Sequence, residues 1–267
     1  QERRRVHEEL GDRRSRAVTL GDIARIMVDK GEVDEALKLH QEEMQVYDEL
    51  GDRRSRAVTL GDIAHIMADK GEVDEALKLH QEEMQVYDEL GDRRSRAVTL
   101  GDIARIMADK GEVDEALKLH QERRRVFDEL GDRRSRAVTL GDIARIMADK
   151  GEVDEALKLQ NERLEVNKSL GDLDGVGAAL FDIARIELQN EEYQEAFEHL
   201  SESYSIFIKL GRLDGICFIG LDLGRLLCQA GQTEQGLEIL KRSQNGFIKL
   251  GQPESASRVE ALIRQFE

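Results

Sequence analysis

Residues 11–50 read GDRRSRAVTLGDIARIMVDKGEVDEALKLHQEEMQVYDEL, and this stretch recurs almost letter for letter from residues 51, 91 and 131 and more loosely from 171 and 211. The first two copies differ only where Arg25 gives way to His65 and Val28 to Ala68. Such identity indicates recent duplication or engineering. Periods of about 20 to 50 residues are typical of solenoids, because one unit cannot bury its apolar face alone and stacks on its neighbours. The sequence therefore predicts one elongated array.

Each period predicts two helices of about 16 residues joined by short turns. Gly31 and Gly51 stand where a left-handed helix end favours glycine, and Asp12 and Asp52 stand where a side chain can cap the next helix. The apolar residues follow helical spacing in both halves of the period. They are Leu20, Ile23, Ala24 and Met27 in the first helix and Val33, Ala36, Leu37, His40, Met44 and Tyr47 in the second.

Composition argues against a membrane, secreted or duplex-binding protein. No apolar run approaches the roughly 20 residues that span a bilayer, and no secretory signal is evident at the N-terminus. The net charge is −16, whereas binding to a nucleic-acid duplex needs a basic face. Cys217 and Cys228 lie too far apart along one helix to be bridged, and they suit a reducing compartment. We therefore expect a cytoplasmic protein.

No catalytic, cofactor or metal constellation emerges from the sequence. Ser15 has no histidine near it in its helix, and His65 lies roughly 15 Å along the helix from Ser55. His40, His80 and His120 recur on the apolar stripe of the second helix, separated by at least about one interhelical distance, so they are interpreted as packing residues. The sequence therefore predicts no enzyme, no cofactor and no metal site.

The string LGDIARIMVDKG from Leu20, followed by EVDEAL, resembles the tetratricopeptide repeat pattern. The residues in its fixed positions would be Leu20, Ile23, Ala24, Met27, Gly31 and Ala36. Leucine and methionine replace the usual aromatic residues, the closing proline is missing, and the period is 40 residues instead of 34. The longer period resembles the long-helix subclass with a Leu-Gly-Asp hinge, as in scaffolds of the Partner-of-Inscuteable type.

This resemblance implies an all-α, right-handed superhelical solenoid of antiparallel helix pairs. We expect a second-helix remnant of a preceding repeat at 1–10, four near-identical repeats at 11–170, two divergent repeats at 171–250 and a capping helix at 251–267. The remnant matches residues 121–130, so we expect the chain to begin inside a repeat. The incomplete repeat would expose an apolar edge, and such an edge would favour end-to-end self-association.

The resemblance also implies that the first helices line a concave groove, at Val18, Gly21, Asp22, Arg25, Val28, Asp29 and their copies. Glycine there would let a ligand backbone approach closely. The charged groove positions form rows that could pair with an extended peptide. The partner-binding candidates are Asp22, Arg25, Asp29, Asp62, His65, Asp69, Asp102, Arg105, Asp109, Asp142, Arg145, Asp149, Asp182, Arg185, Gln189, Asp222 and Arg225.

Other interpretations of these charges remain open. Asp22 with Arg25, and Arg25 with Asp29, have helical spacing and could neutralise each other within one helix. Arg13, Arg14 and Arg16 oppose the helix dipole, so we expect Asp48 and Glu49 to offset them. The arginine runs at 3–5 and 123–125 form basic patches that could bind acidic protein or RNA segments, although a nucleic-acid partner is not favoured.

The function predicted from the sequence is a non-enzymatic scaffold that binds an extended or short helical segment of a partner protein, with selectivity in residues 171–250, where the repeats diverge. The alternatives are a sensor array of a larger signalling ATPase or protease, and a structural spacer or oligomerisation module.

Overall fold

The computed structural model describes residues 12–267, and these residues form thirteen α-helices without any strand. The remnant expected at 1–10 lies outside the described residues. The helices are α2 (Arg13–Asp29), α3 (Val33–Leu50), α4 (Arg53–Asp69), α5 (Val73–Leu90), α6 (Arg93–Asp109), α7 (Val113–Leu130), α8 (Arg133–Asp149), α9 (Val153–Leu170), α10 (Leu173–Gln189), α11 (Tyr193–Leu210), α12 (Leu213–Gln229), α13 (Thr233–Lys249) and α14 (Pro253–Phe266).

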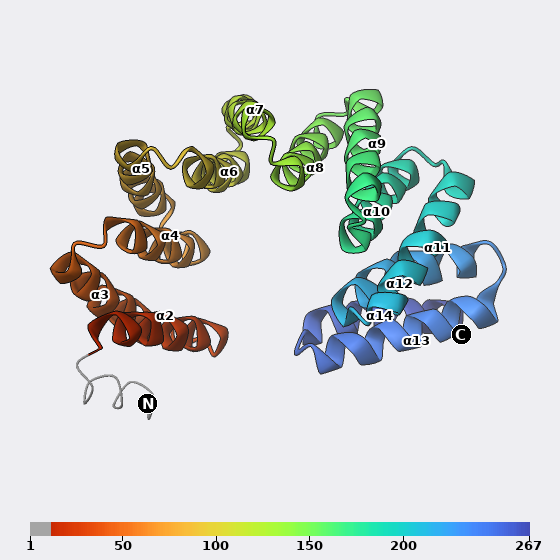
Figure 1. Ribbon diagram of the computed structural model, residues 1–267. Coiled ribbons are helices and arrows are strands. Elements are labelled where there is room, and N and C mark those ends of the chain that lie inside the picture. Colours follow the sequence, from red (N-terminus) through yellow and green to blue (C-terminus); the bar gives the residue numbers. More distant parts are fainter. Residues whose placement is uncertain (1–11) are drawn as a thin grey trace. The chain divides into compact units, whose positions relative to one another are not determined.

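The chain divides into two compact units, one that ends at Asp132 and one that begins at Arg133. Within each unit every helix packs against the next one along the chain, as Figure 1 shows. The first unit contains the helix pairs that begin with α2, α4 and α6, and the second contains those that begin with α8, α10 and α12, followed by α14. The predicted all-α solenoid of helix pairs is confirmed.

The turns between helices follow the predicted chemistry. The side chain of Asp52 accepts a hydrogen bond of 3.1 Å from the backbone N–H of Ser55 and so caps α4. Gly51 ends α3 with a φ of 65°, a left-handed conformation that glycine adopts without a steric cost. One helix end departs from the pattern, because Glu191 stands where the other repeats have glycine and still adopts a φ of 64°.

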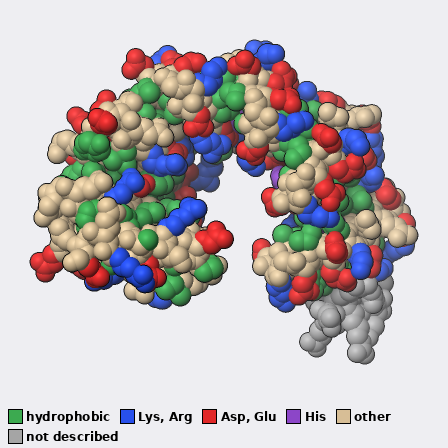
Figure 2. All heavy atoms as spheres, turned by 180° about the vertical axis from the view of Figure 1, so that it is seen from behind, with side chains coloured by type: hydrophobic (Ala, Val, Ile, Leu, Met, Phe, Trp, Pro, Cys, Tyr) green, Lys and Arg blue, Asp and Glu red, His purple; other side chains and the backbone are tan. Residues whose placement is uncertain are grey.

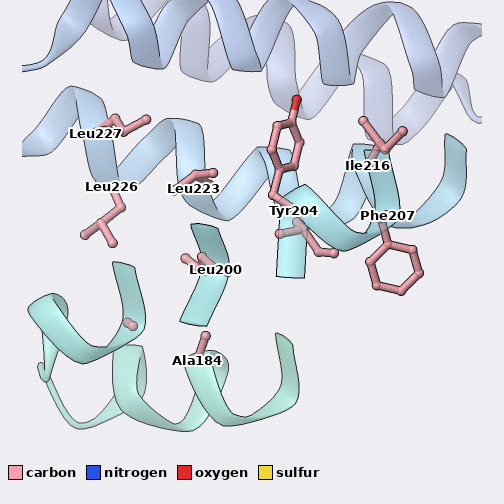
Figure 3. Packing of buried hydrophobic residues seen from close by; sticks show 10 residues of the cluster. Ala184, Leu200, Tyr204, Phe207, Ile216, Leu223, Leu226 and Leu227 are labelled. Atoms are coloured by element: carbon pink, nitrogen blue, oxygen red, sulfur yellow. The ribbon is translucent and has the colours of Figure 1, made fainter. Parts of the chain in front are cut away.

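Small and aliphatic side chains fill the space between the helices. Figure 3 shows this packing in the second unit, where Leu200 of α11 lies between Ala184 of α10 and Leu223 of α12. Ala184 and Leu200 have no exposed surface. At the end of the unit, Val259 and Ile263 of α14 are buried against α12 and α13, with Leu262 and Phe266 packed around them. The predicted capping face of α14 is therefore confirmed.

The predicted apolar stripe of the second helix packs against the core but is incomplete. In α3, Ala36, His40 and Tyr47 are buried as expected, but Leu37 and Met44 keep part of their surface. Leu39, Val46 and Glu43 are buried too. A glutamate in this interior was not predicted, and its burial determines much of the chemistry of the surface described below.

Two expectations about the class of protein can be compared with the described residues. None of the helices formed by residues 12–267 is long and apolar enough to cross a membrane. Cys217 and Cys228 are both buried thiols on α12 and form no disulfide.

The exception at Glu191 provides a test of backbone strain. A non-glycine residue in the left-handed region costs about 1 kcal/mol or more. We expect Glu191→Gly to raise the free energy of unfolding by up to about 1 kcal/mol, and Gly151→Ala, at a φ of 79°, to lower it by about 1 kcal/mol. Urea denaturation of the three proteins measures both changes, and equal midpoints would contradict the strain argument.

Candidate functional site

The structure places the predicted site residues on the first helix of each pair, in three columns one period apart. These are Asp22, Arg25 and Asp29 on α2, Asp62, His65 and Asp69 on α4, Asp102, Arg105 and Asp109 on α6, Asp142, Arg145 and Asp149 on α8, Asp182, Arg185 and Gln189 on α10, and Asp222 and Arg225 on α12. The column that begins at Asp22 is partly buried, and the columns that begin at Arg25 and Asp29 are exposed except at Arg225. Within each unit, we call the surface formed by these residues the inner face.

Ion pairs on the inner face of the first unit run from one repeat to the next. Arg25 donates to Asp22 of its own helix at 3.4 Å and to Asp62 of the next repeat at 3.1 Å. The expected pair between Arg25 and Asp29 does not form, and no described residue makes an ion pair with Asp29. Arg25 instead reaches the partly buried Asp62 of the next repeat while it keeps its contact with Asp22. Charge is therefore balanced between repeats as well as within them.

His65 takes the place of arginine in the second repeat. Its Nε2 atom lies 3.5 Å from Asp102 Oδ1, and its ring meets that of His80 edge to face with the centroids 5.2 Å apart. The hydrogen bond to Asp102 raises the pKa of His65 above its ordinary value, although burial acts in the opposite direction. Burial would raise the pKa of Asp102, yet the bond from His65 holds it below its usual range.

The glycines of the inner face do not serve as points of approach for a ligand, as the sequence suggested. Gly21 is buried, and a Cβ atom added to it would lie 2.6 Å from Glu43 Oε1. The same space is filled by Glu83 at Gly61, by Arg123 at Gly101 and by Arg163 at Gly141. We call these four glycines the windows and the four charged residues of the second helices the window residues. The absent side chain makes room for the neighbouring helix of the same repeat.

The window residues are held by their own helices as well. In α3, His40 Nδ1 lies 2.9 Å from Glu43 Oε2, and both side chains are almost fully buried. His80 and Glu83 repeat this pair at 2.9 Å in α5. The histidines are thus packing residues, as predicted, and they also bond the buried carboxylates. Among residues 12–267 no group of three or more His, Cys, Asp or Glu side chains could hold a metal ion.

In the two divergent repeats the large residue stands on the first helix and the small one on the second, which reverses the arrangement of the first four repeats. Phe181 and Leu221 occupy the window column, and Ser203 and Ser243 occupy the column of the window residues. Ser203 is fully buried and donates to the backbone oxygen of Gly177 at 2.7 Å. The larger side chain thus stands on the first helix in these repeats and the smaller one on the second. This exchange gives the inner face of the last repeats apolar side chains that the first four repeats lack there.

Two adjoining pockets open on the inner face of the second unit. The larger has a volume of 510 Å³ and the smaller 240 Å³, and Arg185 and Gln189 line both. The other residues of the larger pocket are Phe181, Leu188, Phe218, Leu221, Asp222, Arg225, Phe247, Ser255 and Arg258. The other residues of the smaller pocket are Arg145, Ala148, Asp149, Gln160, Asp182 and Ile186. Of the predicted site residues in this unit, all except Asp142 line a pocket.

Aromatic rings and arginines shape the larger pocket. Phe218 is 44% exposed and meets Phe247 edge to face at a centroid distance of 5.0 Å. The guanidinium of Arg185 lies 5.9 Å from the ring centroid of Phe181, within the range of a cation–π contact. Burial raises the pKa of Asp222 above its ordinary value, while Arg225, at 3.1 Å, opposes this shift. Sequence reasoning missed the contributions of Phe218, Phe247 and Arg258, which lie outside the charged rows.

Arginines at the start of α2 and α4 pair with acidic residues at the end of α3, within the repeat in the case of Arg13 and across the hinge in the case of Arg56. Arg13 bonds Glu49, and Arg56 lies 3.0 Å from Asp48. The expectation that Asp48 and Glu49 offset these arginines is confirmed. A further pair was not foreseen, because Arg14 lies 2.8 Å from Asp52, the residue that caps the next first helix.

The basic patch expected at residues 123–125 is reduced by folding. Arg123 is only 8% exposed, and its guanidinium lies 5.6 Å from the ring centroid of Phe127. Figure 2 shows Lys and Arg side chains interspersed with Asp and Glu over the surface. The matching run at residues 3–5 lies outside the described residues.

Comparison with known proteins agrees with this architecture. A family profile described as tetratricopeptide repeat matches residues 15–89, 55–129 and 135–209. No curated protein sequence matches the chain. The finer likeness to scaffolds of the Partner-of-Inscuteable type stays a prediction.

Three solved structures illustrate the likeness in fold. Nearly identical tetratricopeptide-like repeats of a putative kinesin light chain from Podosopora anserina share 23% identity, with a TM-score of 0.59 over 74% of this chain and 98% of that one. A Rap protein complexed with competence and sporulation factor has 12% identity and a TM-score of 0.66, over 91% and 80% of the two chains. A signal transduction ATPase with a tetratricopeptide repeat sensor, from Pyrococcus horikoshii, has 14% identity and a TM-score of 0.67, over 98% and 43%.

The shared volume at the windows predicts strong coupling between two columns. Gly141→Phe should destabilise the second unit by about 1–3 kcal/mol, because the ring would overlap Arg163. Adding Arg163→Ser reproduces the pairing of Phe181 with Ser203. A double-mutant cycle of urea unfolding should therefore give a favourable coupling energy of about 1 kcal/mol or more. Additive effects of the two substitutions would contradict the shared space.

The raised pKa of His65 predicts how stability depends on pH. The folded protein binds the proton more tightly than the unfolded chain, so this stabilisation is fully present below the ordinary pKa of 6.5. It is lost as the pH rises through the raised value. His65→Arg restores the residue of the other repeats and keeps its charge throughout. Compared with this variant, the wild-type protein should lose free energy of unfolding between acidic and mildly alkaline pH. Parallel pH profiles of the two proteins in urea would count against the bond to Asp102.

Proposed function

Because the chain belongs to the tetratricopeptide repeat family, a family of protein-interaction scaffolds, we propose that the inner face of its second unit binds an extended or short helical segment of a partner protein without catalysing a reaction. The observation that carries this proposal is the pair of adjoining pockets that share Arg185 and Gln189. A groove that connects two pockets suits an extended segment of a partner, because successive side chains of the segment can enter the two pockets.

The larger pocket supplies the apolar anchor point. Phe218 presents an exposed ring beside Phe181 and Leu221, and buried aromatic contacts contribute much of the affinity of protein interfaces. The rim of arginines fixes the orientation of the segment through its polar groups. The helices that carry these residues are already ordered, so little conformational freedom is lost on binding.

Divergence gives this surface its selectivity. Four near-identical repeats offer the same contacts in several registers, whereas Phe181, Phe218 and Leu221 occur once each along the array. The Rap protein, whose structure contains competence and sporulation factor, provides an example of a similar fold with a bound partner.

A second candidate function is a sensor within a longer signalling protein. It is favoured by the likeness to the ATPase from Pyrococcus horikoshii, in which the tetratricopeptide repeats are described as the sensor. In that case the same groove would bind the signal, and occupation of the groove would change the activity of the remainder of the longer protein.

Substitution of one exposed ring tests the proposed groove. Peptides selected from a random display library against the wild-type protein should bind Phe218→Glu at least about tenfold more weakly, because a carboxylate would replace the apolar contact. Val138→Glu is the matched control, since Val138 occupies the same repeat position, is 50% exposed and lines neither pocket. The readout is fluorescence polarisation of the labelled peptides.

Two outcomes would overturn the proposal. One is a failure to select any peptide, and the other is an equal loss of affinity in Phe218→Glu and Val138→Glu. Circular dichroism of each variant confirms that the helices are intact.

A further inference from the structure

The window residue of each repeat controls which charges of the inner face are already neutralised. In the first repeat, Glu43 fills the window at Gly21, and Asp62 is paired with Arg25 at 3.1 Å. Glu43 and Asp62 both favour the charged form of Arg25 and raise its pKa, although burial acts in the opposite direction. The arginine of this repeat is therefore held among carboxylates.

The fourth repeat has the opposite arrangement. Arg163 extends past the window at Gly141 and donates to Asp182 of the next repeat at 2.6 Å. This aspartate corresponds to Asp62, so the second helix now supplies the charge that Arg25 supplies in the first repeat. Arg163 also donates to Gln160 at 3.0 Å, and its side chain is only 14% exposed. The hydrogen bonds to Asp182 and Gln160 together hold the guanidinium of Arg163 in place.

The arginines of the inner face are consequently available in the second unit. Arg145 contacts only the aspartate of its own helix, Asp142, at 3.4 Å. Among the described residues, Arg185 and Arg258 form no ion pair. Four arginines line the two pockets, and with Arg163 they outnumber the three lining aspartates. This local positive charge contrasts with the net charge of −16 of the whole chain.

We propose that Arg163 is a positioning residue that sets the charge preference of the groove, so that the second unit selects a partner segment in which Asp or Glu residues flank an apolar side chain. The proposal rests on the proposed function and names the chemistry of the partner. By holding Asp182, Arg163 leaves Arg145 and Arg185 to pair with carboxylates of the segment, while its apolar side chain enters the larger pocket beside Phe218.

The repeats themselves provide the substitution that tests this. Arg163→Glu places a glutamate at the window position of the fourth repeat, as in the first repeat. Gly141, which corresponds to Gly21, provides the room for this side chain. Arg145 should then turn toward the introduced carboxylate and Asp182, as Arg25 does toward Glu43 and Asp62, and should no longer be available to a ligand.

The probes are two labelled peptide libraries with a fixed central phenylalanine, flanked in one by Asp and Glu and in the other by Lys. The wild-type protein should bind the acidic library at least about tenfold more tightly than the lysine library. Arg163→Glu should abolish or reverse this preference, whereas Arg163→Lys should keep it. Arg264→Glu, an equal change of charge at an exposed arginine outside both pockets, should leave it unchanged.

The outcomes separate this inference from the proposed function. If the wild-type protein binds neither library, the peptide-binding groove itself fails. If it binds both libraries equally, or if Arg163→Glu behaves like Arg264→Glu, the groove stands and the role of Arg163 is wrong. If Arg163→Glu lowers the melting temperature sharply, Arg163→Met replaces it, and this variant should lose the preference for the acidic library without gaining one for lysine.

Discussion

In each of the first four repeats a glycine of the first helix makes room for a large charged side chain of the second, and much of the inner face depends on this packing. Gly21 yields its space to Glu43, whereas the fifth repeat has the reverse pair of residues, Phe181 on the first helix and Ser203 on the second. Because a protein interior is closely packed, a large side chain on one helix of the pair requires a small one opposite it on the other. The residue pair at this point therefore differs between the repeats with a charged window residue and those with an apolar residue on the first helix.

The same packing explains why the two halves of the array differ in chemistry although their backbones follow one pattern. In the first repeats the shared space contains carboxylates, and each is bonded by a histidine such as His40. A buried carboxylate without such a bond would be costly. In the last repeats the corresponding residues of the second helices are serines, and Phe181 and Leu221 of the window column line a pocket. The chemistry of the pocket thus follows from residues at the helix interface as well as from the exposed charges.

The fold could be predicted almost fully from the sequence, because the signals that define it are local and repeat. Gly51 and Asp52 mark a helix end and a helix start by their own conformational and hydrogen-bonding preferences. The candidate site was harder to predict from the sequence. The pair of Asp22 with Arg25 could be foreseen from helical spacing, but the contact of Arg25 with Asp62 could not, because it spans 37 residues in sequence. Glu43 was the clearest omission. Helical spacing alone could not show that a glutamate lies in the interior, although the glycine opposite it, read together with the serine opposite Phe181, contained that information.

The bridge at the hinge has a consequence for how the array can grow. In the first four repeats an arginine of one repeat meets the cap aspartate of the next, as Arg14 meets Asp52 and Arg134 meets Asp172. Between the fifth and sixth repeats the charges are exchanged, and Asp174 lies 2.8 Å from Arg212. A copy of an early repeat fits among the first four and preserves every bridge. Inserted after the fifth, it would set aspartate against Asp174 and arginine against Arg212. Duplication of an early repeat therefore preserves the bridges only in the segment in which the near-identical copies occur.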